Sequence, residues 1–343
     1  MIKPSEEQAK VIACDESAVV SARPGSGKTF TMARMIVKAS ERLLSYQGVV
    51  AISYTRKASA ELRDRCSRLG VRAGNSFFGT IDAFCLAIII QQFVPHVVGR
   101  MVKIDVIDDD QLVPASRIKD HWVSPNEDRW DLIREALSLG ALPVSSLSEV
   151  AYCMVKHVPA VRSFLHARYK AVFIDEYQDC GLAQHMLFME LVGLGIRGVA
   201  FGDIDQAIFA YDGRSSAFLK ELIADPRFRS FEITENHRCH RSIVDYSLSL
   251  LGAQAPSRTY QDKRVVLAKV SGDESNIANA IREHLDVIAE RYGIDRRNEF
   301  ALLSTSNKMI ERYAGLLRIP SKIVVSTKLD AGFSRSRLFF REL

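Results

Sequence analysis

The sequence has little of several features that would place it in a specialised class of proteins. Its six cysteines, among 343 residues, show no paired spacing, which is typical of reduced thiols in a cytoplasm. No apolar run reaches the length that spans a bilayer, since Cys85–Ile90 is short and leads into Gln91 and Gln92. The first residues contain no apolar signal core. We therefore expect a cytoplasmic protein without a membrane segment.

Other chemistries are also poorly represented. The formal net charge of +5 permits a polyanionic partner without requiring one. No Cys–His or Ser–His–Asp arrangement suggests a nucleophilic enzyme, and no nuclease-type carboxylate cluster is visible apart from Asp175 and Glu176. His237, Cys239 and His240 are metal-binding residue types, but such close neighbours cannot converge on one tetrahedral zinc ion. We therefore do not expect a zinc protein.

Short apolar segments alternate with helical patterns along most of the chain, which predicts an α/β fold with a parallel sheet. Val49–Tyr54 and Val199–Asp203 are typical of buried strands, and Lys57–Leu69 is typical of a helix. A chain of 343 residues is long enough for two or three domains. Ligands of such sheets bind at the carboxyl ends of the strands, so the polar residues that follow the strands are the candidates for a site.

A glycine-rich segment directly follows the apolar run Ala18–Val20. It has the pattern of a phosphate-binding loop, with Ala where the strict pattern has its first Gly. Glycines let backbone N–H groups approach phosphate oxygens, Lys28 supplies a cation to the β- and γ-phosphates, and Thr29 is an expected Mg²⁺ ligand. The residues of this predicted nucleotide site are Ala22, Arg23, Pro24, Gly25, Ser26, Gly27, Lys28 and Thr29.

A second apolar strand, Ala171–Ile174, leads into two carboxylates. Asp175 is the expected Mg²⁺ ligand, and Glu176 is expected to polarise the attacking water. Together with the phosphate-binding loop, this pair predicts a P-loop nucleoside triphosphatase.

The rest of the chain predicts an insertion and a second sheet. Residues 81–169 are mainly helical and poor in motifs, so they are expected to interrupt the nucleotide-binding domain. Strands are predicted at Arg264–Val270, Phe300–Thr305 and Lys322–Ser326, with helices at Asn276–Arg291, capped by Ser275, and at Asn307–Leu317. The expected domains are 1–80 with 170–230 (nucleotide-binding), 81–169 (helical insertion) and 231–343 (a partial second domain).

Taken in order, the motifs resemble those of the UvrD/PcrA/Rep-like group of superfamily 1 helicases. Besides the phosphate-binding loop and Gln8 upstream of it, the segments that carry the resemblance are Ser53–Ala58, Gly79–Asp82, Asp175–Asp179, Gly202–Gln206 and Thr234–Arg238. The resemblance implies RecA-like domains, the first with a helical insertion. It also implies that ATP and Mg²⁺ drive movement on single-stranded or tailed duplex DNA with 3′→5′ polarity.

The resemblance also implies roles for individual residues at the nucleotide. Gln8 would read the adenine, and His237 stands where the family has a stacking tyrosine. Arg238 would be the transition-state arginine, a group that raises turnover by on the order of 10³–10⁵. Gln206 would couple the γ-phosphate to the DNA groove. Without the family, Arg238 reads as a surface arginine before a helix, and Gln206 as an ordinary loop residue.

The DNA contacts that the resemblance implies are Tyr54, Arg56, Lys57, Thr80, Phe209 and Tyr211. Stacking of a base on an aromatic side chain is worth roughly 1–3 kcal/mol, and Arg56 and Lys57 would contact phosphates. The alternatives stay open: aromatics at i and i+2 line one face of a strand, and the two cations are solvated charges at a helix N-terminus. Asp212 is a departure, because the family has arginine there.

A narrower resemblance is to the helicase-like subunit of the Gabija antiphage system. Asp82 stands where repair helicases have His, and Tyr177 and the short insertion favour the same group. This resemblance implies an OLD-family ATPase-nuclease as partner in a hetero-oligomer, and a role in antiviral defence. Two alternatives remain: an ATP- and DNA-sensing regulatory subunit that docks to the nuclease without unwinding, and a DNA repair helicase.

The family's motifs V and VI have no counterpart before Leu343. The second domain is therefore expected to be incomplete. Alone, this chain is expected to bind ATP·Mg²⁺, to hydrolyse it slowly and to separate no duplex.

Overall fold

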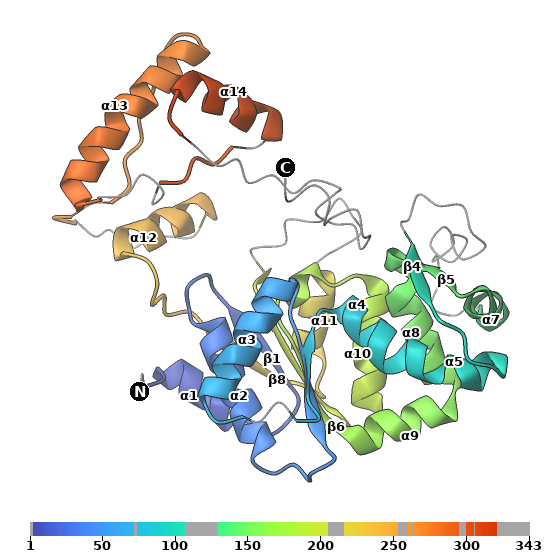
Figure 1. The fold of residues 1–343 in the computed structure, drawn as a ribbon. Helices are drawn as coiled ribbons and strands as arrows, with labels where there is room; N and C mark the ends of the chain where they lie inside the picture. Colours follow the sequence, from blue (N-terminus) through green and yellow to red (C-terminus); the bar gives the residue numbers. More distant parts are fainter. Residues whose placement is uncertain are drawn as a thin grey trace. The chain divides into compact units, whose positions relative to one another are not determined.

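The computed structural model divides the chain into two compact units, Met1–Pro256 and Ser257–Leu343. It describes residues 3–71, 74–107, 129–204, 216–252, 260–262, 264–294, 300–304 and 306–320. The first unit contains a large parallel sheet with helices on both faces (Figure 1). This architecture confirms the predicted α/β class.

The sheet has six strands, all parallel. Their order is β3 (Phe77–Gly79), β2 (Gly48–Ile52), β6 (Tyr169–Ile174), β7 (Arg197–Gly202), β1 (Ala18–Ala22) and β8 (Arg229–Ile233). The four strands expected from apolar runs therefore lie side by side in the centre, as β2, β6, β7 and β1. Because they are covered on both faces, they are continuously apolar, as is typical of central parallel strands.

Alternate residues of each strand enter two separate hydrophobic clusters. In β6, Ala171 and Phe173 face one cluster, whereas Val172 and Ile174 face the other. The first cluster is covered by α1 (Glu6–Ala13), α2 (Lys28–Ser40) and α3 (Arg56–Arg68). The second cluster is covered by α10 (Leu182–Gly193), α11 (Ala217–Ala224) and the insertion. The sheet is thus the middle of three layers.

The segment expected to be an insertion is mainly helical over its described residues, and it adds a small sheet. Its helical elements are α4 (Ile81–Phe84), η1 (Cys85–Ile90), α5 (Gln91–Val98), α7 (Trp130–Leu139), η2 (Val144–Ser146), α8 (Leu147–His157) and α9 (Pro159–Arg168). A parallel pair, β4 (Asp105–Ile107) and β5 (Ala141–Pro143), joins them. The apolar side chains of these helices belong to the same cluster as one face of the main sheet. The insertion is therefore part of the first unit's core.

One prediction about apolar length was wrong. The elements α4, η1 and α5 run on as a single helix, Ile81–Val98, whose 18 residues and hydropathy of 1.7 would suffice to cross a membrane by length and composition. Gln91 and Gln92 were expected to end the apolar run, but the helix continues through both residues. In the fold, Gln91 donates to the Val102 carbonyl at 2.9 Å, and Phe84, Ile90 and Val94 are buried in the core. The buried side chains of this helix belong to the core that the insertion shares with one face of the main sheet.

The domain boundary expected at residue 231 falls inside β8. This strand pairs with β1 along Arg229–Ile233, so it belongs to the first unit, which continues through α12 (Arg241–Leu250). The hydrophobic pattern of β8 is weak, because only Ile233 is buried. An edge strand of this kind is hard to recognise from periodicity.

The second unit contains two of the expected helices. α13 (Glu274–Tyr292) and α14 (Asn307–Leu317) pack together, and the Arg282 guanidinium donates to the Leu316 and Leu317 carbonyls at 3.1 and 3.2 Å. The cap of α13 is Asp273, whose carboxylate accepts the Asn276 N–H at 2.9 Å, and not Ser275 as expected.

The strands expected in this unit are not formed over the described residues 264–270 and 300–304. Leu267 and Leu303 are 78% and 88% exposed. An extended segment becomes a strand only when a neighbour completes its hydrogen bonds, and no such neighbour is present among the described residues. The third expected strand, Lys322–Ser326, lies outside them.

The close approach of Gly48 to the turn before β3 can be tested by substitution. A Cβ at Gly48 would fall on the carbonyl oxygen of Asn75, in the backbone turn that leads to β3. We expect Gly48→Ala to reduce the free energy of unfolding by about 1–3 kcal/mol, because backbone must move to relieve the overlap. Urea denaturation measures the effect. Gly193→Ala is the matched control, since its Cβ would meet no atom within 4 Å, and equal stability of the two variants would contradict the proposed contact.

Candidate active site

The polar residues that follow the strands gather at the carboxyl edge of the sheet. The phosphate-binding loop follows β1, Asp175 and Glu176 follow β6, and Tyr54 lies just beyond β2. Thr80 follows β3, and Thr234 follows β8. Because all six strands are parallel, these segments from distant parts of the sequence meet at one edge.

The phosphate-binding loop is shaped by its glycines and by contacts from both sides. Gly25 and Gly27 have φ values of +73° and +84°, in the left-handed region that glycine adopts without strain. A Cβ at Gly27 would lie 2.6 Å from Gln8 Nε2, so only glycine fits. Gly27 is the cap of α2, and Lys28 and Thr29 form its first turn. Free N–H groups at a helix start are a ready site for phosphate oxygens.

Gln8 lies directly against this loop. Its Nε2 donates to the Ser26 carbonyl at 2.8 Å, and its Oε1 accepts the Ser5 N–H at 3.0 Å. The side chain is 4% exposed. The structure therefore brings Gln8 to the predicted nucleotide site and engages its amide with protein groups on both sides.

The Lys28 ammonium contacts the Glu176 carboxylate. The two atoms, Lys28 Nζ and Glu176 Oε2, are 2.7 Å apart, although the residues are 148 positions apart in the chain. Gln178 Nε2 donates to the same oxygen at 2.8 Å, and Gln178 Oε1 accepts the Asp203 N–H at 3.0 Å. Glu176 has φ of +52°, which is rare for a residue with a side chain and is typical of strained functional turns.

The two neighbouring carboxylates differ in acidity. Burial, and then the charge of Glu176, raise the pKa of Asp175 from 3.8 to about 6. Burial also acts to raise the pKa of Glu176. The charge of Lys28 and the hydrogen bond from Gln178 outweigh this effect, so the pKa of Glu176 lies below its usual value. Glu176 is therefore the more acidic member of the pair.

The segment after β8 crosses the phosphate-binding loop. Asn236 Nδ2 donates to the Pro24 carbonyl at 2.6 Å, and the His237 N–H donates to the Gly25 carbonyl at 2.9 Å. The His237 ring is exposed beside the loop, and Arg238 is also exposed. The backbone of His237 therefore contacts the phosphate-binding loop, and Arg238 is the next residue along the chain.

These residues fit a nucleotide with Mg²⁺. The Ser26 hydroxyl is buried and makes no hydrogen bond to the residues that the structure describes. The glycine conformations leave room for an anion at the start of α2, where Lys28 supplies positive charge. Thr29 and Asp175 offer the hydroxyl and carboxylate oxygens that Mg²⁺ prefers. Within the described part of the chain, no group of three or more His, Cys, Asp or Glu residues suits another metal ion.

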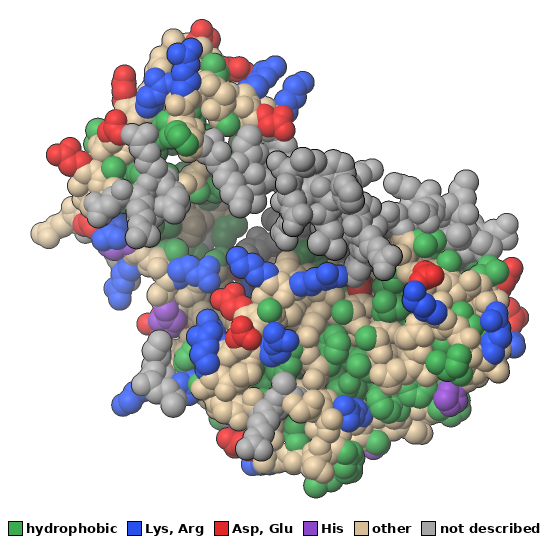
Figure 2. Space-filling model, in the orientation of Figure 1, with side chains coloured by type: hydrophobic (Ala, Val, Ile, Leu, Met, Phe, Trp, Pro, Cys, Tyr) green, Lys and Arg blue, Asp and Glu red, His purple; other side chains and the backbone are tan. Residues whose placement is uncertain are grey.

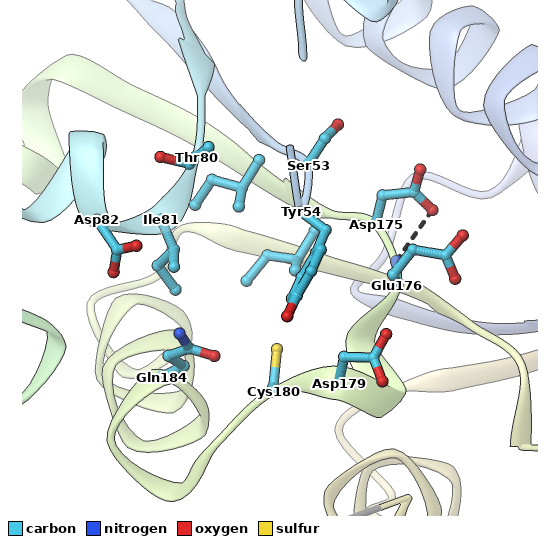
Figure 3. Close-up of a pocket in the computed structure, with 12 residues that line it drawn as sticks. Ser53, Tyr54, Thr80, Ile81, Asp82, Asp175, Glu176, Asp179, Cys180 and Gln184 are labelled. Carbon is cyan, nitrogen blue, oxygen red and sulfur yellow. Dashed lines mark hydrogen bonds between the residues drawn. The ribbon is translucent and has the colours of Figure 1, made fainter. Parts of the chain in front are cut away.

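A cavity of about 240 Å³ lies beside Asp175 and Glu176 (Figure 3). Tyr54, 47% exposed, stands at its rim, and Thr80 forms part of the wall. The Thr80 hydroxyl oxygen caps α4 by accepting the Ala83 N–H at 3.3 Å. The other residues that line the cavity are Ile52, Ser53, Ile81, Asp82, Ile174, Asp179, Cys180 and Gln184. The cavity places an aromatic side chain next to the predicted catalytic carboxylates.

Of the other residues expected to contact DNA, the structure describes Arg56 and Lys57. Arg56 and Lys57 are exposed in the first turn of α3, whose cap is the Thr55 side chain. Gln206, Phe209, Tyr211 and Asp212 lie outside the described residues.

Two residues of the site were part of the recognised motifs but had no predicted role. Gln178 links Glu176 to the end of β7, and Asn236 links the Arg238 segment to the phosphate-binding loop. Their amides, each with a donor and an acceptor, were the available signal. A sequence shows that an amide is present, but not which two segments it joins.

The raised pKa of Asp175 predicts an unusual effect on stability. Asp175 is harder to ionise in the folded chain than in the unfolded chain, so its ionisation costs stability as pH rises through about 6. We expect Asp175→Asn to raise the stability of the nucleotide-free chain at pH 8 by up to about 3 kcal/mol, with the difference vanishing below about pH 4. Thermal denaturation without nucleotide or Mg²⁺ measures it. Asp64→Asn, at an exposed carboxylate, is the control, and a stability loss in Asp175→Asn at pH 8 would contradict the argument.

The chain is similar to several known proteins. The family model described as UvrD/REP helicase N-terminal domain matches residues 4–123 and 126–226, which is more than half of the chain. The ATP-dependent DNA helicase UvrD1 of Mycobacterium tuberculosis is 25% identical, in a match that covers 94% of this chain and 49% of that protein. The Gabija protein GajB of Bacillus cereus is 28% identical, over 67% of this chain and 45% of GajB.

Among solved structures, the Pif1 helicase of Candida albicans aligns over 83% of this chain and 55% of that chain, with 13% identity and a TM-score of 0.40. The chain spans about half the length of the curated relatives it matches. The family match includes the phosphate-binding loop, Asp175, Glu176 and the insertion. The chain therefore belongs to the UvrD/REP helicase N-terminal domain family, the UvrD-like helicases.

Proposed function

We propose that this chain is the motor part of an ATP-dependent DNA helicase or translocase, which uses ATP hydrolysis to move on single-stranded DNA. The observation that carries the proposal is the contact of Lys28 with Glu176 at the carboxyl edge of the sheet, 2.7 Å apart. It joins the phosphate-binding loop to the carboxylate that would activate water. The family membership supports the same activity.

Binding of ATP would exchange one partner of Lys28 for another. In the structure, the ammonium is neutralised by Glu176. The β- and γ-phosphates compete for this cation, and a charge-assisted contact with phosphate is at least as strong. Glu176 would then be free to orient water, with Gln178 still holding its Oε2. Mg²⁺, held with the nucleotide by Thr29 and Asp175, would offset the negative charge of the phosphates.

The remaining roles at the nucleotide follow the motif positions. Gln8 would read adenine after releasing one of its protein partners, and His237 would stack on the base. Arg238 would meet the charge that develops on the transferred phosphoryl group. Gln206 would sense the γ-phosphate.

DNA would bind along the same edge of the sheet. Figure 2 shows several Lys and Arg side chains on the upper edge of the first unit, which is the carboxyl edge of the strands. Arg56 and Lys57, exposed at the start of α3, would contact phosphates, and Tyr54 would stack on a base, with Thr80 beside it. Phe209 and Tyr211 would add further stacking. Tyr54 and Glu176 line the same cavity, which supports a DNA path close to the proposed hydrolysis site. The 3′→5′ polarity is proposed from the family alone.

The match to the Gabija protein GajB favours a second candidate function. In this case the chain would serve in antiviral defence, as a subunit that binds ATP and DNA and docks to an OLD-family nuclease without unwinding. The third candidate is a DNA repair helicase, and the match to the ATP-dependent DNA helicase UvrD1 supports the helicase part of it. ATP hydrolysis with and without single-stranded DNA, alone and with a co-purifying partner, separates a motor from a sensor.

Two substitutions test the nucleotide site directly. Lys28→Ala should abolish ATP binding, because the phosphates lose a charge-assisted contact. Glu176→Gln should retain ATP binding but lower hydrolysis by on the order of 10² or more, because only the water-orienting carboxylate is lost. Titration with a fluorescent ATP analogue and a phosphate-release assay measure the two steps. Lys38→Ala, on the same helix but paired with Asp15 at 2.8 Å, is the control. Unchanged turnover in Glu176→Gln would remove that residue from the mechanism.

The DNA path is tested through its salt dependence. If Arg56 neutralises one phosphate, Arg56→Ala should reduce the slope of log affinity against log salt by about 0.7 for single-stranded DNA. Fluorescence anisotropy with a labelled oligonucleotide at several salt concentrations gives this slope. Arg42→Ala is the control, because Arg42 is 78% exposed and lies beyond the C-terminal end of α2, away from the carboxyl edge. An unchanged slope in Arg56→Ala would place Arg56 outside the DNA path.

A further inference from the structure

The first helix carries two consecutive glutamates with different surroundings. Glu6 is solvated, with a side chain 85% exposed, and pairs with Lys10 of the next turn at 2.9 Å. Glu7 turns instead to the segment that follows β8. Its Oε2 accepts the Thr234 N–H at 2.7 Å and the Glu235 N–H at 3.3 Å, and its Oε1 accepts the Thr234 hydroxyl at 2.8 Å. One carboxylate thus holds three donors of a segment far away in the sequence.

These hydrogen bonds favour the ionised form of Glu7. Burial acts to raise the pKa of Glu7, but the hydrogen bonds from Thr234 and Glu235 lower it more, to below its usual value. A carboxylate with two oxygens can accept all three donors, whereas an amide has one accepting oxygen. Hydrogen bonds to an ionised group are about twice as strong as those between neutral groups. An amide here could keep these contacts only without the charge and with the Thr234 hydroxyl accepting instead of donating, so a carboxylate makes the strongest contact at this position.

The segment that Glu7 holds leads directly to the predicted catalytic arginine. Asn236 Oδ1 accepts the Arg238 N–H at 2.9 Å and the Cys239 N–H at 2.7 Å, while its Nδ2 donates to the Pro24 carbonyl. The His237 N–H donates to Gly25. The backbone from Thr234 to Cys239 is therefore attached at one end to α1 and in its middle to the phosphate-binding loop.

Gln8, which follows Glu7 on α1, contacts the phosphate-binding loop. Gln8 donates to the Ser26 carbonyl of the phosphate-binding loop. Two consecutive side chains of α1 thus contact two parts of the site. Gln8 contacts the phosphate-binding loop, and Glu7 contacts residues 234–239, called here the arginine segment because it contains Arg238. A shift of α1 would move both.

We propose that Glu7 is a positioning residue for ATP hydrolysis, and that its carboxylate holds Thr234 and Glu235 so that Arg238 lies at the phosphate end of the nucleotide site. The role of Arg238 in this inference rests on the proposed function. Glu7 itself does not touch the nucleotide. Its effect reaches the reaction through the backbone of residues 234–238.

The first test is independent of any activity. Hydrogen–deuterium exchange of peptides that cover residues 234–239 should be about tenfold faster in Glu7→Gln than in the wild-type chain, because the Thr234 and Glu235 amides lose the charge of their acceptor. Glu6→Gln is the matched control, with the same change one residue earlier on the same helix, and its exchange should equal that of the wild type. Equal exchange in Glu7→Gln and Glu6→Gln would overturn the proposal.

The second test uses ATP turnover. Glu7→Gln should lower kcat about tenfold with a smaller change in KM, whereas Glu6→Gln should not lower it. Thr234→Val, which removes one donor, should lower kcat, and Thr234→Ser should restore most of it. In an Arg238→Ala background, Glu7→Gln should have little further effect, because the arginine that it positions is absent.

The outcomes separate the two proposals. Additive losses in the double variant, or a normal kcat with fast exchange in Glu7→Gln, would show that Glu7 does not act through Arg238. Absence of hydrolysis in the wild-type chain would overturn the proposed function of this chain. In that case, the exchange measurement still decides whether Glu7 holds the segment. Equal melting temperatures of Glu7→Gln and Glu6→Gln exclude a general loss of folding as the cause.

Discussion

The site depends on the fact that all six strands of the main sheet run in the same direction. Parallel strands end at one edge, so each loop that follows a strand must begin there. This constraint brings Lys28, after β1, to Glu176, after β6, across 148 residues of sequence. It also brings Thr234, after β8, to the side of the phosphate-binding loop. The buried apolar residues of the strands hold this edge rigidly, because alternate side chains are anchored in two separate cores.

The charges at this edge are arranged at a cost that the surrounding fold must offset. Asp175 ionises reluctantly because it is poorly hydrated and lies next to another carboxylate. Glu176 adopts a left-handed backbone conformation to turn its side chain towards Lys28 and Gln178. In the proposed reaction the phosphates would take Lys28 from Glu176, while Gln178 would keep hold of the Glu176 carboxylate. Among the described residues of the first unit, the one non-glycine residue with positive φ is thus the carboxylate proposed to activate water.

Hydrogen bonds of side-chain amides and carboxylates connect the segments that meet there. Gln178 joins the end of β6 to the end of β7, Asn236 joins the arginine segment to the phosphate-binding loop, and Gln8 joins that loop to α1. Each of these side chains bridges two loops that the sheet brings close but does not itself connect. These hydrogen bonds connect the loops at the carboxyl edge of the sheet to one another.

The sequence by itself determined the class of fold, the central strands and the identity of the phosphate-binding and carboxylate segments. It could do so because burial of a parallel sheet demands uninterrupted apolar runs, and because phosphate binding demands glycine and lysine at a short, local spacing. The same local signals located α3 and α14 to within a residue or two. Local rules failed at the weakly apolar strand β8, at the long apolar helix Ile81–Val98 and at the segments 264–270 and 300–304. Whether such segments form strands, core helices or neither depends on partners that are remote in the sequence. Tertiary structure alone decided that Glu7 contacts Thr234 while Glu6 faces solvent, because α1 lies beside the end of β8 only after the sheet has formed.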